Sequence, residues 1–226
     1  MFPIVESSAS TSYSANQTSH AVDLPSGVSS GDLLLLWFCM DSTTGTVTTP
    51  TGWNLEEGPL LQTDRSILYS RIADGLEGAT VTVATSTSES STAIAVRISG
   101  ADNFITASGS APSGIMANPT SVTATASAES ILLCFGSSLG AITVPEIANG
   151  PLTEVFQAGN SADTNNTVSC ELVYANRTTT AEEEVAVLPW RWSQSVAHRT
   201  ATVLVHGMSS AIAAGFPLSR TFNTGC

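Results

Sequence analysis

Lysine is absent from this chain of 226 residues, and the seven basic residues are all arginine. Charged residues make up only 12% of the sequence, and 19 acidic residues give a formal net charge of -12. Proteins bind nucleic acids through cations that displace the counterions of the phosphates. This charge balance therefore argues against a nucleic-acid partner, and the surface is expected to consist largely of serine, threonine, asparagine and glycine.

Long apolar segments are also missing. The longest run, LLLLWFCM at 33–40, is far shorter than the roughly 20 residues with which a helix crosses a bilayer. The start, MFPIVESSAS, has neither the basic nor the apolar region of a secretory signal. We therefore expect a soluble protein that has no membrane partner.

The four cysteines show no C-x-x-C spacing, the pattern that marks zinc sites and redox pairs. Cys39, Cys134 and Cys170 lie in apolar, strand-like runs and are expected to be small buried residues. Cys226 is the last residue and is expected to be an exposed free thiol, although exposure also allows pairing between chains.

Helical periodicity is absent, whereas short runs of valine, isoleucine, threonine and aromatic residues recur between clusters of glycine, proline, asparagine and serine. We therefore predict an all-β fold. The run at 33–40 is apolar on both faces, which predicts a central strand that is covered on both sides. The predicted strands are 3–8, 19–24, 32–40, 66–72, 80–85, 92–99, 121–126, 130–136, 152–157, 168–175, 183–190 and 200–206.

The order of features repeats along the chain. Each half has an apolar run, a turn that contains proline, a run that ends in tyrosine and arginine, and an apolar run closed by glycine. The period is far longer than the roughly 20 to 50 residues of solenoid and propeller repeats. The alignment matches Leu33 with Ile131, Pro50 with Pro145, Tyr69 with Tyr174 and Gly100 with Gly207.

This repeat predicts one antiparallel β-sandwich over 1–207, built from two similar halves at about 1–101 and 119–207. The segments 102–119 and 157–167 are rich in small polar residues and are predicted to be surface loops, the first of which crosses between the halves. Residues 73–78 carry two glycines and are predicted to form a hairpin connection.

The segment 208–226 has no counterpart in the first half and is predicted to be a contact arm. Its apolar anchors are expected to be Ile212, Phe216, Leu218 and Phe222, unless these side chains fold back on the domain.

Several short motifs resemble a β-sandwich domain of tailed-phage virion proteins and bacterial surface proteins. The resemblance covers the first half, whereas the second half keeps only the order of elements, with Glu129-Ser130 in place of Gly31-Asp32 and no tryptophan after Pro145. It implies a jelly-roll-like component of a shell or appendage, without catalytic residues or a cofactor. The motifs are Leu24-Pro25, Gly31-Asp32-Leu33-Leu34, Thr49-Pro50-x-Gly52-Trp53, Tyr69-x-Arg71-x-Ala73-Asp74-Gly75 and Ala95-Val96-Arg97-Ile98-Ser99-Gly100.

On this basis we expect a non-enzymatic capsid decoration protein on the outer surface of the virion. Its partners are expected to be the major capsid protein and copies of itself, in an oligomer such as a trimer. Before assembly the protein is expected to be soluble in the host cytoplasm. An acidic surface suits the outside of a particle, because no cationic face toward packaged DNA is needed there.

An alternative function is that of a tail or fibre adhesin. Trp190 and Trp192 alternate around Arg191, and with Trp53 they match the stacking platform of a carbohydrate-binding module. Packing in a core or an interface is the favoured interpretation, because large aromatic residues are usually well buried and Pro189 indicates an edge position.

A hydrolase is the third hypothesis. Residues 136–140 match G-x-S-x-G around Ser138, with Asp163 and then His198 and His206 downstream. The nucleophile elbow of such enzymes needs a helix directly after the serine, whereas 141–145 has the pattern of a strand or loop. We therefore interpret the motif as a chance match and expect no enzymatic activity.

Metal ligands are not clustered in the sequence. His20, His198 and His206 are scattered and are expected to be hydrogen-bonded residues at strand ends. The acidic runs Glu56-Glu57 and Glu182-Glu183-Glu184 lack the closely alternating ligands of a calcium loop and are expected to be solvated.

Overall fold

The computed structural model describes residues 2–42, 44–61, 64–117, 119–139, 146–147, 154–159, 168–185 and 190–208. These residues form fourteen strands and no helix, and all strand pairs are antiparallel, which confirms the predicted all-β class. The strands are β1 (Ile4–Asp23), β2 (Leu33–Met40), β3 (Val47–Thr48), β4 (Asn54–Leu61), β5 (Arg65–Ile72), β6 (Thr80–Ser99), β7 (Ala101–Ala117), β8 (Val122–Thr123), β9 (Ala128–Leu139), β10 (Glu146–Ile147), β11 (Glu154–Gly159), β12 (Val168–Thr179), β13 (Glu184–Val185) and β14 (Trp190–Gly207).

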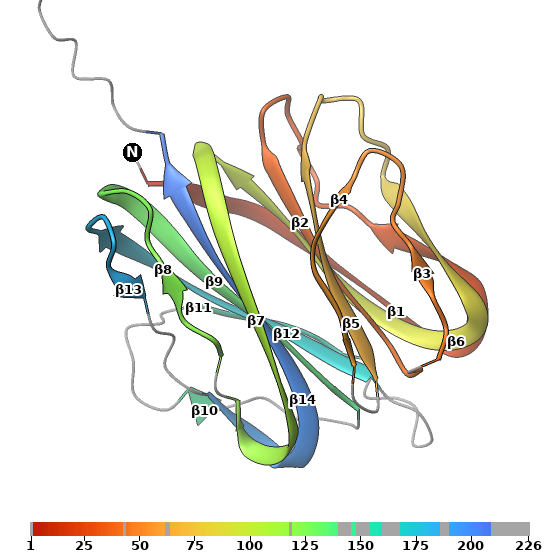
Figure 1. Cartoon of the computed structure of the whole chain (residues 1–226). Helices are drawn as coiled ribbons and strands as arrows, with labels where there is room; N and C mark the ends of the chain where they lie inside the picture. Colours follow the sequence, from red (N-terminus) through yellow and green to blue (C-terminus); the bar gives the residue numbers. More distant parts are fainter. Residues whose placement is uncertain are drawn as a thin grey trace, which may run out of the picture.

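Each half of the chain forms one large sheet, and the two sheets have the same strand order. The first sheet runs β1-β6-β2-β5-β4, with β3 also paired to β6. The second runs β7-β14-β9-β12-β11, with β10 also paired to β14. In Figure 1 the red-to-yellow first half and the green-to-blue second half lie side by side without exchanging strands. The repeat in the sequence is therefore a repeat of a whole sheet.

The strand register shows which residues correspond. Leu33 lies opposite Ile98, and Ile131 lies opposite Val205, so the predicted matches of Leu33 with Ile131 and of Gly100 with Gly207 are confirmed. The match of Tyr69 with Tyr174 is wrong by one residue. Tyr69 lies opposite Leu36 on an outer face, whereas Tyr174 packs against the inner core, because a shift of one residue turns a strand side chain to the other face. Val173 occupies the position that corresponds to Tyr69.

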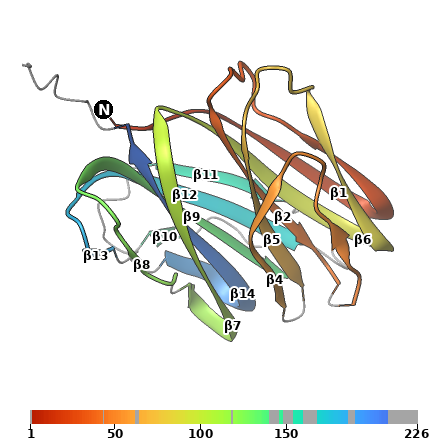
Figure 2. The same cartoon turned by 45° about the horizontal axis from the view of Figure 1, so that its top comes forward.

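One hydrophobic cluster is shared by the inner faces of the two sheets. Trp37 of β2 and Phe135 of β9 occupy corresponding positions, and their ring centroids lie 6.0 Å apart. The edges of the sheets also meet: Glu57 of β4 accepts 2.6 Å hydrogen bonds from the hydroxyls of Thr106 and Ser108 on β7. Figure 2 gives a second view of these two groups of strands. Alternate residues of each central strand therefore face the opposite sheet.

The central strand β2 is buried on both faces, as predicted. Its outer face is covered by distant parts of the first half, among them Val22, Val83 and Trp53. The paired strands β1 and β6 reach this position because register shifts between Tyr13 and Ser19 bend the ladder. Each of these strands was predicted as two short strands, but their polar middle sections stay paired and each forms a single strand of 20 residues.

Two predicted connections differ from the structure. The segment 102–119, predicted as a loop, belongs mainly to β7, which pairs along β14 and follows β6 after the single residue Gly100. Backbone hydrogen bonds to β14 hold this polar segment in a strand despite its small side chains. Residues 73–78 do not connect a hairpin, because β5 and β6 are separated by β2 in the sheet.

Candidate functional site

One end of the molecule gathers loops, charged side chains and exposed apolar residues. The last row of the first sheet places Val5, Ile98, Leu33 and Ile72 on neighbouring strands at this end. The backbone amide of Met208 donates to the carbonyl oxygen of Gly100 there, at 3.1 Å. This end, called the loop end below, comprises residues 4–5, 24–32, 72–79, 99–101 and 208, and it lies at the top of Figure 1.

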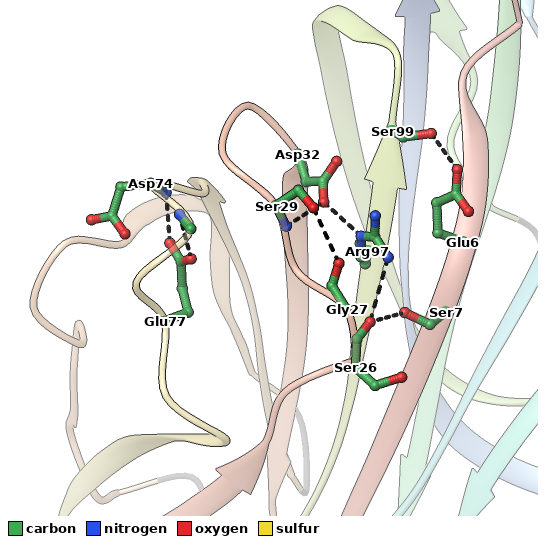
Figure 3. A network of polar contacts seen from close by, with 11 residues as sticks. Glu6, Ser7, Ser26, Gly27, Ser29, Asp32, Asp74, Glu77, Arg97 and Ser99 are labelled. Carbon is green, nitrogen blue, oxygen red and sulfur yellow. Dashed lines mark hydrogen bonds and ion pairs between the residues drawn. The ribbon is translucent and has the colours of Figure 1, made fainter.

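An ion pair between Asp32 and Arg97 holds the first of these loops. Arg97 Nε lies 2.6 Å from Asp32 Oδ2, and the same carboxylate oxygen accepts the backbone amide of Ser29 at 2.8 Å. Arg97 Nη1 also reaches the carbonyl oxygen of Ser26, which accepts the hydroxyl of Ser7 (Figure 3). The loop is thereby tied to both β6 and β1.

A second network holds the turn between β5 and β6. Glu77 accepts hydrogen bonds from the backbone amides of Asp74 and Gly75 at 2.8 and 3.0 Å (Figure 3). Arg71 binds Glu77 and Asp74, each at 3.0 Å. Hydrogen bonds to charged groups are stronger than neutral ones. These contacts therefore stabilise one conformation of the turn.

Exposed apolar side chains lie beside these networks. The described part of the chain has five exposed large apolar residues, and four of them are at the loop end: Leu76 (88% exposed), Ile72 (63%), Met208 (54%) and Ile4 (51%). The fifth, Leu55, is on the edge strand β4. Exposed apolar residues that gather in one place, beside polar ones, are typical of protein interaction surfaces.

A pocket of about 320 Å³ opens beside the outer face of the first sheet. Its wall includes Trp53, Arg71, Glu77 and Thr82. Gly52 lies beside Arg71 and has a φ of +79°, a backbone conformation that favours glycine; a Cβ atom at this position would lie 2.8 Å from Arg71 Nη1 and would require the guanidinium group to shift. The pocket therefore combines an indole, a guanidinium group and hydroxyl groups.

The members of the predicted tryptophan platform come from both halves of the chain. Trp53 is 6% exposed and belongs to the cluster outside the first sheet. Trp190 and Trp192 are on β14 of the second sheet, and their side chains lie outside the described part of the structure. The predicted anchors Ile212, Phe216, Leu218 and Phe222, together with Asp163 and Cys226, also lie outside the described residues.

Three of the predicted hydrolase residues, Ser138, His198 and His206, lie on the outer face of the second sheet. Ser138 of β9 lies directly opposite His198 of β14 on one side and Ser169 of β12 on the other. All three are buried, and Ser138 Oγ has no hydrogen-bond partner. Ser138 stands within a strand, so the strained turn of a nucleophile elbow is not formed at this serine.

Glu171 of β12 adds a carboxyl group beside Ser138, His198 and Ser169, and these four residues are called the polar row below. Glu171 was not among the residues singled out from the sequence. It lies opposite Gly136, is 4% exposed, and its Oε2 atom has no hydrogen-bond partner. Burial without a cation raises the pKa of Glu171 to about 8, because the charged form loses its hydration. The carboxyl group is therefore mostly protonated at neutral pH.

The histidines are engaged in hydrogen bonds within the sheets. His20 bonds to the hydroxyls of Ser91 and Thr85, at 2.7 and 3.3 Å, and it lies three residues before the end of β1. His206 bonds to Ser130 at 2.8 Å. Burial lowers the pKa of both histidines. Among the residues that the structure describes, no group of three or more histidine, cysteine or acidic side chains is placed to hold a metal ion.

Comparison with known proteins gives no match to a protein-family model, to a curated protein or to a solved structure. Within the described ranges no helix is long and apolar enough to cross a membrane.

Sequence reasoning did not find the polar partners at these sites. The pairs Asp32–Arg97 and Asp64–Arg199 join residues that are 65 and 135 positions apart. The alternation of a strand indicates the face on which an arginine lies, but it does not indicate which loop returns to that face. Arg97 and Asp32 were noted only as members of the resembling motifs.

Proposed function

We propose that this protein is a non-enzymatic structural component of a virion, most simply a capsid decoration protein that binds the outer surface of the major capsid lattice. The observation that carries the proposal is the loop end, where four exposed apolar side chains lie at the same end of the molecule as two loops held by ion pairs. A pre-formed surface of this kind loses little conformational freedom on binding, which favours docking to another protein.

The proposal includes a β-sandwich architecture. It is supported by the cluster that both sheets share and by the ring contact of Trp37 with Phe135. In a jelly roll the strands of both halves are interleaved between two sheets, whereas the strand order found here assigns each sheet to one half of the chain. We therefore propose a β-sandwich in which each half of the chain forms one sheet, rather than a jelly roll.

The negative charge supports the outer face of the particle as the binding site. With a formal net charge of -12 and no lysine, the chain is poorly suited to face packaged DNA. We propose that it binds the capsid protein and copies of itself, as an oligomer such as a trimer.

The test uses expanded shells assembled from the major capsid protein of the same genome. We expect the purified protein to cosediment with these shells in a saturable way and to raise the temperature at which they break. Double substitution of Ile72→Ser and Leu76→Ser is expected to weaken cosedimentation at least tenfold. Leu55→Ser is the matched control, because Leu55 is 48% exposed but lies on β4 rather than at the loop end.

Two results would contradict this proposal. One is a wild-type protein that fails to bind such shells at micromolar concentration. The other is an image of the intact particle that places the protein on the tail or its fibres. Light scattering of the isolated protein determines whether it is an oligomer.

The adhesin remains a second proposal, because the pocket beside the first sheet places Trp53 next to Arg71 and Thr82. Indole rings and hydroxyl groups are suited to bind a sugar. A glycan array comparing the wild type with Thr82→Val and with Trp190→Ala tests it. Loss of a sugar signal with either variant favours the adhesin, and the absence of any signal from the wild type excludes it.

A further inference from the structure

Four small polar side chains meet where the two sheets face each other. Cys39 of β2 lies opposite Ser66 of β5 in the first sheet, and Ser137 of β9 lies opposite Cys170 of β12 in the second. All four residues are buried. Between the sheets, Ser66 Oγ lies 2.6 Å from Ser137 Oγ, and the thiol of Cys39 is hydrogen-bonded to the thiol of Cys170.

The internal repeat relates these two contacts to each other. Leu33 corresponds to Ile131, so Cys39 corresponds to Ser137 six residues further along. By the same register Ser66 corresponds to Cys170. The cysteine pair therefore repeats, on the other side of the internal symmetry, the geometry that brings the two serine oxygens within 2.6 Å.

A neighbouring residue places the second thiol independently. Thr92 of β6 lies opposite Cys39, and its Oγ1 atom is 3.6 Å from Cys170 Sγ. Cys170 is thus next to the strand pair that carries Cys39. Both cysteines belong to the cluster that joins the sheets.

We infer that Cys39 and Cys170 form a disulfide bond between the two sheets when the protein folds in an oxidising environment. The oxidant is a small-molecule disulfide such as oxidised glutathione. One cysteine thiolate attacks it, forms a mixed disulfide and releases one thiol; the second cysteine then attacks the mixed disulfide at the protein sulfur and releases the other thiol. Two protein thiols lose two protons and two electrons, and the reagent gains both.

The disulfide is expected to form during folding, before the two cysteines are buried. Burial raises the pKa of the Cys39 thiol well above its ordinary value, so the folded protein holds almost no thiolate there. In a reducing compartment the two cysteines stay reduced, and in an oxidising medium the bond forms before the sheets close. The bond then ties together parts of the chain that are 131 residues apart, because it joins position 39 to position 170.

The experiment refolds the Cys226→Ser chain from denaturant, once with reduced and oxidised glutathione and once with a reductant. Thiols counted in denaturant are expected to fall from the three of Cys39, Cys134 and Cys170 to one. The melting temperature of the oxidised product is expected to be higher by about 5 °C or more. Incubating the folded, reduced protein with the same reagent is expected to give far slower loss of thiols.

Peptide mapping without reduction identifies which two cysteines are bonded in the Cys226→Ser chain, which keeps Cys39, Cys134 and Cys170. Trypsin leaves Cys134 and Cys170 in one peptide, 98–177, because no arginine or lysine lies between them. A glutamate-specific protease is therefore added, which cuts after Glu146 and Glu154 and separates the two cysteines. The expected cross-linked pair contains Cys39 and Cys170.

Cys134→Ser is the matched control, because Cys134 is as buried but lies on the outer face of the second sheet, 3.5 Å from Thr202 Oγ1. It is expected to keep the bond, whereas Cys39→Ser is expected to lose it. A second variant moves the bond to the symmetric position, with Ser66→Cys and Ser137→Cys in a chain that carries Cys39→Ser and Cys170→Ser.

The inference is overturned if oxidative refolding leaves three thiols in the Cys226→Ser chain while the moved pair becomes cross-linked. It is also overturned if the mapped bond contains Cys134. These results do not depend on the binding function proposed above.

Discussion

Both sheets carry an apolar cluster on the outer face, but these faces differ at the end opposite the loop end although the sheets share one strand order. In the first sheet, Phe38 and Ile67 lie opposite each other and belong to a buried apolar cluster. At the corresponding positions the second sheet has Gly136 opposite Glu171. Where the first sheet has Met40, the second has Ser138. At this end the same backbone therefore continues the apolar cluster in the first sheet, whereas in the second sheet the apolar cluster gives way to a polar row.

The inner faces of the two halves are alike, whereas their outer faces differ in part. The inner positions must fit each other across the sheets, and Trp37 and Phe135 still meet at the centre. Among the described residues, the apolar cluster outside each sheet consists of residues from one half of the chain, so each cluster could change without the other. Variants that exchange residues between corresponding positions test this reading directly.

The largest effect is expected from placing the residue of the second sheet in the first. Ile67→Glu puts a carboxyl group into an apolar cluster in which Ile67 is 3% exposed. We expect a loss of about 4 kcal/mol or more of unfolding free energy at pH 7. Urea denaturation measures it, and an unchanged midpoint would show that the outer core tolerates a polar group after all.

The next effect concerns the ion pair between the sheets. Arg199 and Asp64 are fully buried and 2.7 Å apart, whereas the repeat has Thr92 and Val168 at the corresponding positions. Arg199→Met leaves a buried carboxylate alone and is expected to cost about 3–5 kcal/mol. Replacing both partners, with Asp64→Leu and Arg199→Met, is expected to recover most of that loss in a double-mutant cycle. A double variant as unstable as the single one would contradict this account.

The polar row is expected to make stability depend on pH. Because burial raises the pKa of Glu171 from 4.5 to about 8, the folded protein binds one proton more than the unfolded chain between these values. Its contribution to stability is complete below pH 4.5 and decreases by roughly 1.4 kcal/mol per pH unit up to about pH 8. Glu171→Gln and Glu171→Ile are expected to remove this slope. Equal slopes in wild type and variants, measured by urea denaturation from pH 5 to 9, would contradict it.

The smallest effect compares a motif that both halves contain. Arg71 binds Glu77 and Arg177 binds Glu183, with the same spacing of six residues. The side chain of Glu77 is 2% exposed and that of Glu183 is 29% exposed. Glu77→Gln is expected to cost about 1–2 kcal/mol, because it weakens buried charged hydrogen bonds. Glu183→Gln is expected to cost less, because water screens the exposed pair. The reverse order in thermal denaturation would contradict the assignment.

The sequence predicted several elements well because their patterns are local. The run at 33–40 is apolar on both faces and became the fully covered strand β2. The strand β7 was missed because its serines, alanines and glycines carry no such pattern, and only pairing with β14 holds it. The match of Tyr69 with Tyr174 failed for a related reason, since the register between strands is not visible in a single strand.

The candidate sites were harder to predict than the strands. The Ser138 motif in the sequence indicated one residue of the polar row. The other residues come from β12 and β14, which the structure pairs with β9 on its two sides. The sequence showed four cysteines without a recognisable spacing, and the facing of Cys39 and Cys170 follows from the packing of two sheets. Nothing in the local pattern indicates which residues of distant strands will share a row.

By itself, the amino-acid sequence determined the all-β class, the duplicated order of elements and the central, doubly covered strand, because hydrophobic alternation and turn residues act over a few positions. Only the tertiary structure decided the strand register, the pairing of each buried charge and the different character of the two outer faces. These depend on contacts between residues far apart in the chain, where a shift of one position reverses what a side chain meets.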